Sequence, residues 1–395
     1  MEVLYKRCCG IDIHKNVLVA CVFISVRKKE IRQFGTMTDD ILQLTQWLKE
    51  VNCEMAAMES TGSYWKPVYN VFEEEQIPII VVNAQHIKGV PGRKTDVKDA
   101  EWIADLVRHG LVKASFIPSR EQRELREITR YRQELIEERA RELNRIQTVL
   151  EGCNLKLGSV ITDISGKSGI AILKAIVSGE TDPFILSQLA EGKARSKSVE
   201  LQRALRGSIH QHQRLLLKHQ LEHLEAMSKI IEDIDSDIEK KTESMNHQTQ
   251  LLDEIPGIGK KSAERLLAEI GTEMNQFKDQ SHFSSWAGLV PECKESAGKK
   301  MSTRIRKGNK HVKSVLVECA RSAIRNKKSY FYSRYQRIAS CRGGKRALIA
   351  VYHILKDLQP YRELGCDYYD TCNHEKIVQR NIRSLERLGV KVMIE

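Results

Sequence analysis

Four carboxylates near the start of the chain occupy positions from which they could bind divalent metal ions. Asp12 lies inside the apolar run 10–13, where burying a carboxylate costs free energy unless it meets a cation or another partner. Glu59 ends a second apolar run, and Asp96 and Asp99, three residues apart, share one face of a predicted helix. Such oxygen donors suit Mg²⁺ or Mn²⁺, and two ions about 3.5–4 Å apart can activate an attacking oxygen and stabilise a leaving oxygen at phosphorus.

Each of these acids, taken singly, also has an ordinary structural interpretation. Asp96 fits a helix cap, and Asp99 fits a first-turn charge that matches the helix dipole. Glu59 fits an ion pair with a lysine. Taken together, however, the four acids stand at points that one α/β fold would bring together, so we favour a metal site over four unrelated roles.

Serines within a basic segment form a second candidate site. The segment 294–313 contains Ser296 and Ser302 among eight basic residues and one acid. A serine hydroxyl can attack a phosphodiester when cations stabilise the developing charge, but the commoner use of such a serine is a hydrogen bond to phosphate. The spacing alone leaves both roles open. From this segment we expect nucleic-acid contacts by Lys299, Lys300, Arg304, Arg306, Lys307 and Lys310.

The sequence Ile-Pro-Gly-Ile-Gly at 255–259 is typical of a helix-hairpin-helix element. Gly257 and Gly259 would let backbone amides at a helix N-terminus approach a phosphate, and Lys260 and Lys261 would add positive charge. A plain loop before a helix is the alternative. The proline before the glycines and the helical pattern that follows favour phosphate binding.

Positive charge is concentrated in one part of the chain. Residues 291–347 carry 17 Lys and Arg against 3 Asp and Glu, a net charge of +14, whereas the whole chain of 395 residues carries +12. Residues 1–110 are close to neutral, with 14 basic and 15 acidic side chains. A cationic block of this density predicts a polyanionic partner, nucleic acid above all, although a solvated basic face is the alternative.

The composition is that of a folded chain with a sizeable core. Hydrophobic residues make up 41% and charged residues 29%, which excludes a disordered or collagen-like chain. No run approaches the roughly 18 apolar residues of a membrane-spanning helix, and no signal segment marks the chain for export. The ten cysteines show no zinc-finger spacing, so we expect free thiols in a reducing cytoplasm.

The first part of the chain alternates between strand and helix patterns. Three strands linked by hairpins are followed by helix, strand, helix, strand and helix, which is the order of the ribonuclease H-like fold. In that order the first and fourth strands are neighbours at the sheet centre, so Asp12 and Glu59 would meet on one face. The predicted elements are strands Gly10–Ile13, Val17–Val26, Ile31–Phe34, Cys53–Glu59 and Ile77–Asn83 and helices Ile41–Val51, Tyr64–Glu75 and Asp96–Val107.

Two long helical runs follow. Residues 119–151 contain no Gly or Pro and have apolar residues near the 3.5-residue spacing of a coiled coil. A stretch punctuated by Gly and Ser, Gly152–Gly179, interrupts the pattern before a second run, Leu201–Met245. The two runs could pack as a hairpin within the chain or pair between subunits, and we favour dimerisation. The predicted stripes are Ile136, Leu143, Ile146 and Leu150 in the first run and Met227, Ile230, Ile234 and Ile238 in the second.

These patterns predict three domains: an α/β domain at 1–118, a helical coiled-coil insert at 119–248 and a mostly α-helical domain at 249–395. The last would contain the helix-hairpin-helix element and the basic segment. Its predicted elements are Lys260–Ile270, Phe277–Leu289, Val312–Ile324 and Lys345–Leu358.

Five motifs together resemble the DEDD transposases of the insertion-sequence-one-ten family, with which the invertase Piv shares the pattern. The motifs are GIDIHK, MESTG, KTDVKDA, IPGIG and GLVP…KESAGKK…RIRKGNKH, in the family's order. The resemblance implies a RuvC-like N-terminal domain, a coiled-coil insert and a C-terminal transposase domain. It also implies that Asp12, Glu59, Asp96 and Asp99 are the family's four acids. The family's nucleophilic serine matches Ser296; because this chain reads Ser-Ala-Gly where the family usually has Ser-Gly, Ser302 stays an alternative.

The resemblance further implies partners and a reaction. Members of the family insert circular intermediates, and several are guided by a structured noncoding RNA that pairs with donor and target DNA. We therefore expect double-stranded DNA, a guide RNA and a homodimer or homotetramer, acting on nucleoid DNA in a prokaryotic cytoplasm. A RuvC-like junction endonuclease, a site-specific invertase and a non-catalytic nucleic-acid-binding protein are the alternatives.

Overall fold

A computed structural model of the chain describes most of its residues. These are 3–25, 28–60, 62–82, 96–290, 294–296, 299–302 and 308–339, together with 355–356, 361, 363–365, 368, 378–379 and 382. The chain divides into two units, Met1–Pro118 and Ser119–Glu395.

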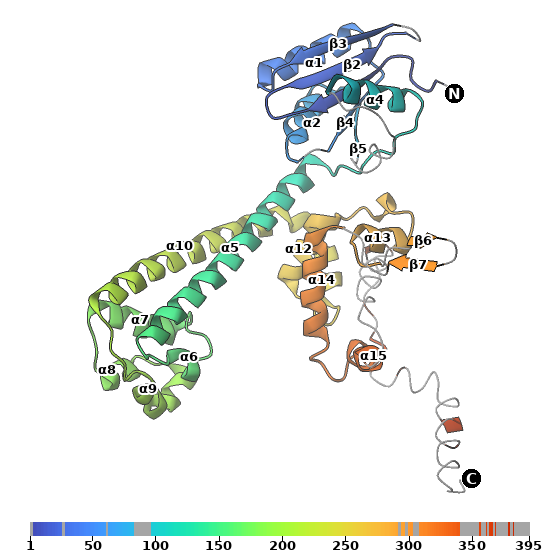
Figure 1. The fold of residues 1–395 in the computed structure, drawn as a ribbon. Coiled ribbons are helices and arrows are strands. Elements are labelled where there is room, and N and C mark those ends of the chain that lie inside the picture. Colours follow the sequence, from blue (N-terminus) through green and yellow to red (C-terminus); the bar gives the residue numbers. More distant parts are fainter. Residues whose placement is uncertain are drawn as a thin grey trace. The chain divides into compact units, whose positions relative to one another are not determined.

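A five-stranded mixed sheet forms the centre of the first unit (Figure 1). The strand order is β3-β2-β1-β4-β5, with β1 antiparallel to β2 and parallel to β4. The sequence of elements is the one predicted, including the neighbouring first and fourth strands. The strands are β1 (Cys8–Ile13), β2 (Leu18–Phe23), β3 (Lys29–Phe34), β4 (Met55–Glu59) and β5 (Ile79–Val82).

Helices cover both faces of this sheet. On one face α1 (Thr38–Glu50) and α2 (Trp65–Glu74) pack on residues such as Ile11 and Met58. On the other, α4 (Asp96–Arg108) packs on residues such as Val19. Every residue of β1 and β2 is therefore buried, which explains why both read as continuous apolar runs.

In the second unit, two long helices pack side by side as an antiparallel hairpin. They are α5 (Arg120–Gly152) and α10 (Gln211–Lys241). Arg132 of α5 pairs with Asp235 of α10, and Nε of Arg139 donates to the Ser228 hydroxyl at 3.0 Å. The sum of the paired residue numbers stays nearly constant along the pair, so the helices run in opposite directions. The contact that the sequence allowed either within or between chains is thus made within one chain.

The buried stripes of this hairpin agree with the predicted ones in part. In α5 the predicted Ile146 and Leu150 are fully buried, whereas Ile136 and Leu143 are only partly buried and Leu135 and Glu142 are buried in their place. In α10 the predicted Met227 and Ile238 are buried, whereas Ile230 is 41% exposed. A straight helix has 3.6 residues per turn and drifts away from a 3.5-residue stripe, and the middle of this pair is held by polar contacts instead. The buried residues of α10 are Leu217, Leu221, Leu224, Met227 and Ile238.

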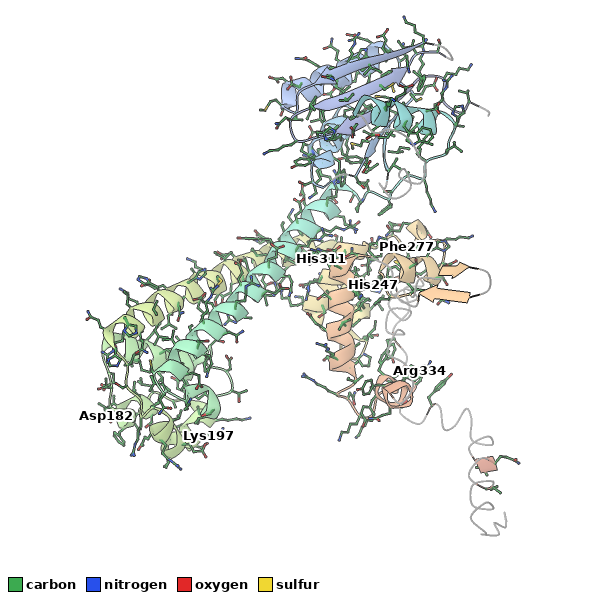
Figure 2. The ribbon with its side chains drawn as sticks, in the orientation of Figure 1. Asp182, Lys197, His247, Phe277, His311 and Arg334 are labelled. Carbon is green, nitrogen blue, oxygen red and sulfur yellow. The ribbon has the colours of Figure 1, made fainter. Side chains whose placement is uncertain are left out.

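Short helices close the far end of the hairpin. The stretch Gly152–Gly179, which we expected only to interrupt the helical pattern, contains two helices, and the expected run 201–245 is broken before α10. An added Cβ at Gly207 would lie 2.4 Å from the Cys153 carbonyl oxygen, so the chain crosses the hairpin end closely there. Figure 2 labels Asp182 and Lys197 in this region. Its elements are α6 (Leu157–Val160), α7 (Lys167–Ser178), α8 (Pro183–Gln188), η1 (Gly192–Lys197) and α9 (Ser198–Ala204).

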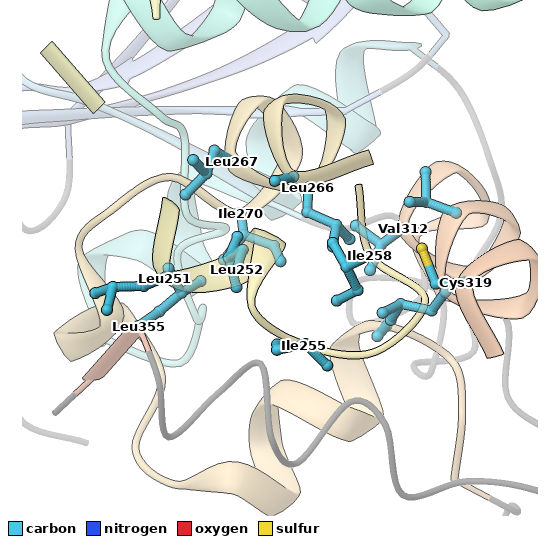
Figure 3. Packing of buried hydrophobic residues seen from close by; sticks show 14 of the residues in the cluster. Leu251, Leu252, Ile255, Ile258, Leu266, Leu267, Ile270, Val312, Cys319 and Leu355 are labelled. Carbon is cyan, nitrogen blue, oxygen red and sulfur yellow. The ribbon is translucent and has the colours of Figure 1, made fainter. Parts of the chain in front are cut away.

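The remaining helices of the second unit surround a separate apolar core (Figure 3). Leu252, Leu266 and Phe283 are fully buried in it, and Val312 packs against them from another helix. The predicted helix Lys345–Leu358 lies outside the described residues except for two of its positions. The elements are η2 (Glu243–Met245), α11 (Asn246–Asp253), α12 (Lys260–Ile270), η3 (Met274–Gln276), α13 (Gln280–Trp286), β6 (Lys294–Ser296), β7 (Lys299–Ser302), α14 (Lys310–Ala323) and α15 (Tyr330–Ala339).

Among the described residues, no helix has both the length and the apolar character needed to cross a bilayer. The cysteines that the structure describes as free thiols are Cys8, Cys9, Cys21, Cys53, Cys153 and Cys319.

Candidate active site

Asp12 is a buried carboxylate near the end of the central strand β1. Its residue is 8% exposed, and β1 pairs with β2 on one side and β4 on the other. The Oδ2 atom of Asp12 lies 3.1 Å from Nε2 of His14, whose side chain is about half exposed. The sequence patterns did not single out His14, although a histidine two residues after a strand-buried acid is a signal that could have been used.

Glu59 ends β4 beside Asp12. The parallel register pairs Gly10 with Ala57 and Ile11 with Met58, so the next step along both strands brings Asp12 next to Glu59. Side chains alternate between the two faces of a strand. Ala57 belongs to the apolar cluster on the α4 face, so Glu59, two residues later, points to that same face.

The first turn of α4 lies at this same end of the sheet. A Cβ added at Gly10 would come within 2.2 Å of the Ala100 carbonyl oxygen and 2.3 Å of the Ala104 amide nitrogen, so α4 rests directly on β1. The Cys8 thiol contacts the Ala104 carbonyl oxygen at 3.4 Å, which shows that α4 runs antiparallel to β1. The acidic start of the helix is therefore directed toward Asp12. A glycine inside an apolar strand is a general sign of such close approach.

The acids at this end of the sheet are Asp12, Glu59 and Asp99, with Asp96 as the first residue of α4. Asp99 and Glu59 are half-buried, and the side chain of Asp96 lies outside the described residues. Among the side chains that are described, no group of three or more His, Cys, Asp and Glu residues is placed to hold a metal ion. The donor chemistry fits a hard divalent cation. A four-acid metal site at this end of the sheet stays a prediction.

Ser296 and Ser302 lie in a two-stranded hairpin of the second unit. Ser296 is the last residue of β6 and pairs with Lys299, and Ser302 pairs with Lys294 at the base of the hairpin. Ser296 is thus at the end of its strand that lies farther from the base of the hairpin, whereas Ser302 is at the base. The side chains of both strands lie outside the description, as do the whole of residues 303–307, including Arg304, Arg306 and Lys307.

The two glycines before α12 have different surroundings. Gly257 has a positive φ of 91°, and a Cβ there would lie 2.4 Å from the Cys319 carbonyl oxygen of α14. Gly259 precedes the first residue of α12, and an added Cβ would meet no atom within 4 Å. Gly257 thus serves close packing of the loop on α14, whereas the backbone at Gly259 is open to solvent. Phosphate binding here stays a prediction.

Lys260 and Lys261 face carboxylates in the structure. Nζ of Lys260 lies 3.0 Å from Glu239 Oε1, and Nζ of Lys261 lies 3.4 Å from Asp235 Oδ1. Burial raises the pKa of Glu264, which lies 3.6 Å from Lys261. Acids of α10 therefore partly neutralise the positive charge expected at the start of α12. These acids lie more than twenty residues before the lysines, so the local motif could not indicate them.

Comparisons with known proteins place two parts of the chain in transposase families. Residues 9–155 match the sequence model for DEDD transposases of the IS110 type, described as "Transposase", and residues 249–336 match the "Transposase IS116/IS110/IS902 family". A "Probable family 20 transposase" of Pseudomonas aeruginosa is 24% identical over 320 residues, which cover 80% of each chain.

Two further relatives match shorter parts. The "Insertion element IS116 uncharacterized 44.8 kDa protein" of Streptomyces clavuligerus is 26% identical over 253 residues, 56% of this chain and 61% of that protein. The "Pilin gene-inverting protein" of Moraxella bovis is 44% identical over 55 residues, 14% of this chain and 17% of that protein.

Proposed function

We propose that this chain, which belongs to the IS116/IS110/IS902 family of transposases, cuts and rejoins DNA. In this proposal four acids bind divalent metal ions and a serine is the nucleophile. The acids are Asp12, Glu59, Asp96 and Asp99, and the nucleophile is Ser296. One observation supports the acidic site above others. The register of β1 with β4 and the antiparallel course of α4 direct acids from three separate segments to one end of the sheet.

The four acids would hold Mg²⁺ or Mn²⁺. When bound there, such an ion polarises a phosphodiester and stabilises negative charge on a departing oxygen. Burial of Asp12 orients its carboxylate, and the imidazole of His14 supports one of its oxygens.

Ser296 would supply the attacking oxygen. Its hydroxyl gives up a proton and forms a bond from Oγ to phosphorus, while the bond from phosphorus to the 3′ oxygen breaks and that oxygen takes up a proton. The DNA strand is then held as a phosphoserine ester. Attack by the 3′ hydroxyl of an exchanged strand reverses the step and releases the serine. Ser302, at the base of the hairpin, is the alternative nucleophile.

The basic residues of the second unit would bind nucleic-acid backbones. Lys310 is exposed at the start of α14, immediately after the densest run of positive charge. Phosphate contacts of this kind fix position without reading sequence, so a noncoding guide RNA would specify the donor and target DNA. The enzyme would act as a homodimer or homotetramer. The proposed contacts are Gly257, Gly259, Lys260, Lys261, Lys299, Lys300, Arg304, Arg306, Lys307 and Lys310.

The proposal can be tested by two substitutions with matched controls. Asp12→Asn and Ser296→Ala should each abolish recombination of a plasmid that carries the joined ends of the element, while binding to that DNA is retained. Asp39→Asn, an exposed acid of the same unit, and Ser302→Ala should leave recombination within a few-fold of the wild type. After denaturation, DNA should stay covalently attached to the wild-type protein and not to Ser296→Ala. Recombination by Ser296→Ala would contradict the covalent step.

Site-specific inversion is a second candidate reaction. The 55-residue match at 44% identity to a protein named as a gene inverter favours it. The same chemistry would serve inversion and insertion, because only the arrangement of the two DNA sites differs. Plasmids with the sites in inverted and in direct orientation distinguish the two outcomes. A junction endonuclease would instead release cut DNA without an adduct, and a non-catalytic binding protein would leave the DNA intact.

A further inference from the structure

The segment that carries the candidate serine leaves and rejoins the helical core at one place. Gly288, with a φ of 68°, follows α13, and Gly308 precedes α14. A Cβ added at Gly308 would lie 2.2 Å from the Gly288 amide nitrogen and 2.5 Å from the Trp286 carbonyl oxygen. The amide of Asn309 donates to that same carbonyl at 3.0 Å. The residues on either side of the segment 289–307 are therefore in backbone contact.

Asn309 makes two kinds of hydrogen bond at the end of this segment. Its Oδ1 atom accepts from the amides of His311 at 2.9 Å and Val312 at 3.2 Å, so it caps the N-terminus of α14. Its Nδ2 atom donates to Oε2 of Glu269 at 2.7 Å. The first contact is local to the helix, whereas the second ties the helix start to α12. Asn309 thus joins the returning segment to a second helix.

Glu269 is a buried carboxylate, 3% exposed, whose two oxygens are both bound. Nε of Arg130 donates to Oε1 at 2.6 Å and Nη2 donates to Oε2 at 2.8 Å, a bidentate pair. Arg126, one turn earlier on α5, donates to the backbone carbonyl oxygens of Ala268, at 3.1 Å, and of Glu269. A buried and fully paired carboxylate of this kind holds its partners in one geometry, because breaking any contact leaves a buried charge or donor unpaired.

We infer that Glu269 and Asn309 are positioning residues that hold Gly308, where the chain returns from the serine hairpin, against α12 and α5, and so set the direction of that hairpin. The inference rests on the proposed role of Ser296 as the nucleophile. Figure 2 labels His311 at this junction. A hairpin whose strands are only three and four residues long has little stability of its own, so its direction depends on how its ends are held.

A second buried glutamate on the same helix gives a matched control. Glu264 is 2% exposed, and lies five residues before Glu269. Its partners are Lys260 at 4.0 Å and Lys261 at 3.6 Å, both on α12 itself. It has no contact with Asn309. Glu264→Gln therefore changes a buried carboxylate of α12 while leaving the contacts of the returning segment in place.

The experiment separates the two roles of Asn309. Asn309→Ser keeps an oxygen that caps α14 and removes the donor to Glu269. At saturating DNA, with the joined-ends plasmid as the probe, we expect adduct formation to slow by about 10- to 100-fold, because a displacement of about 1 Å in a reacting group costs that much. The dissociation constant for the same DNA should change less than two-fold. Glu264→Gln should leave the rate of adduct formation at saturating DNA within two-fold of the wild type.

A donor–acceptor exchange provides the rescue. In the double variant Glu269→Gln with Asn309→Asp, the amide and the carboxylate trade places, so the hydrogen bond between positions 269 and 309 and the single negative charge are retained, while Nη2 of Arg130 loses its acceptor on residue 269. Each single variant should form the adduct slowly, and the double variant should form it faster than either single variant. Equal slowing in the single and double variants would overturn the inference.

Native tryptic cleavage within residues 299–307 reports the clamp without any reaction. Asn309→Ser should be cleaved there about ten-fold faster than the wild type, and Glu264→Gln at the wild-type rate. An unchanged cleavage rate in Asn309→Ser would refute the clamp, whatever the chemistry. Absence of an adduct in the wild type, or an adduct in Ser296→Ala, would instead refute the proposed nucleophile. The cleavage rate would then decide alone whether Glu269 and Asn309 hold the segment.

Discussion

Replacing Gly10 with alanine should separate α4 from the sheet that carries the candidate acids. The added Cβ would lie 2.2 Å from the Ala100 carbonyl oxygen and 2.3 Å from the Ala104 amide nitrogen, whereas ordinary contact begins at 3.4 Å. Both neighbours are backbone atoms within a helix and cannot rotate away. The helix as a whole must therefore move by about 1 Å, since a packed interior has no free volume to absorb the methyl group.

The size of the effect follows from this displacement. Overpacking of a close-packed interior costs about 1–3 kcal/mol, and the rigid backbone contact places Gly10→Ala near 2 kcal/mol or above. A displacement of about 1 Å between Asp12 and the acids of α4 should also lower the recombination rate by about 100-fold. Stability and activity should fall together, because one movement causes both.

Buried thiols provide an assay that is specific to this unit. Cys9 and Cys21 are fully buried, and burial together with the charge of Glu101 raises the pKa of Cys21 to about 11. Both thiols therefore react with a thiol reagent only after the unit opens. A loss of about 2 kcal/mol should speed their labelling roughly 30-fold at pH 7 without denaturant. Mass spectrometry of the labelled peptides gives the rate at each cysteine.

Gly35→Ala is the matched control for this reasoning. Its added Cβ would lie 2.0 Å from Oδ2 of Asp40, nominally a closer contact than at Gly10. The neighbour is the end of a flexible side chain, which can rotate away at the cost of its hydrogen bond from the Met37 amide. We expect a loss of about 1 kcal/mol or less and near-normal recombination. Equal labelling rates in the two variants, or wild-type activity in Gly10→Ala, would refute the argument.

Three further predictions concern the second unit. Leu150→Ala, at a fully buried position of α5, should lower the free energy of unfolding by about 3 kcal/mol in urea denaturation; a loss below about 1 kcal/mol would contradict its burial. Glu142→Leu should be neutral or stabilising in the same assay, because it replaces a buried carboxylate whose partner Arg145 is largely exposed; a loss above about 2 kcal/mol would contradict this. Burial alone would raise the pKa of Glu269, but hydrogen bonds led by Arg130 hold it below its ordinary value of 4.5. The ionised carboxylate therefore stabilises the folded protein fully above pH 4.5, and this contribution is lost as the pH falls through the lower folded-state pKa. Glu269→Gln should therefore reduce the dependence of stability on pH below 4.5 in acid titrations followed by circular dichroism, and an unchanged slope would argue against this carboxylate as the titrating group.

The arrangement of the sheet could be predicted from the sequence because local signals agreed with one topology. Apolar runs, hairpin turns and one amphipathic helix per crossover left a single order, and that order makes Asp12 and Glu59 neighbours. The contact of Gly10 with α4 could be anticipated only in kind, as a close approach. Its partners, Ala100 and Ala104, lie ninety residues along the chain.

Details that depend on pairs of distant residues could not be predicted. Glu142 is buried in α5 although the predicted stripe contained its neighbour Leu143, because His223 of α10 lies 3.5 Å from Glu142 and Arg145 pairs with its carboxylate. Lys260 and Lys261 suggested an exposed cationic helix start, but α10 supplies acids beside them. The hydrogen bonds of Glu269 join α12 to α5 and to the start of α14, and the spacing of apolar residues within each helix does not indicate these contacts.

The antiparallel course of α5 and α10 has a consequence for how this chain can change. Nζ of Lys241, at the end of α10, lies 3.4 Å from Oε2 of Glu124, in the first turns of α5. The start of α5 and the end of α10 are therefore close together. Exposed loops among residues 153–210, at the opposite tip, can therefore accept insertions without displacing either of these contacts, whereas the buried residues of that tip, which share a core with α5 and α10, cannot be removed. That tip is the natural place to graft a fluorescent reporter, and the place where sister sequences are freest to diverge in length.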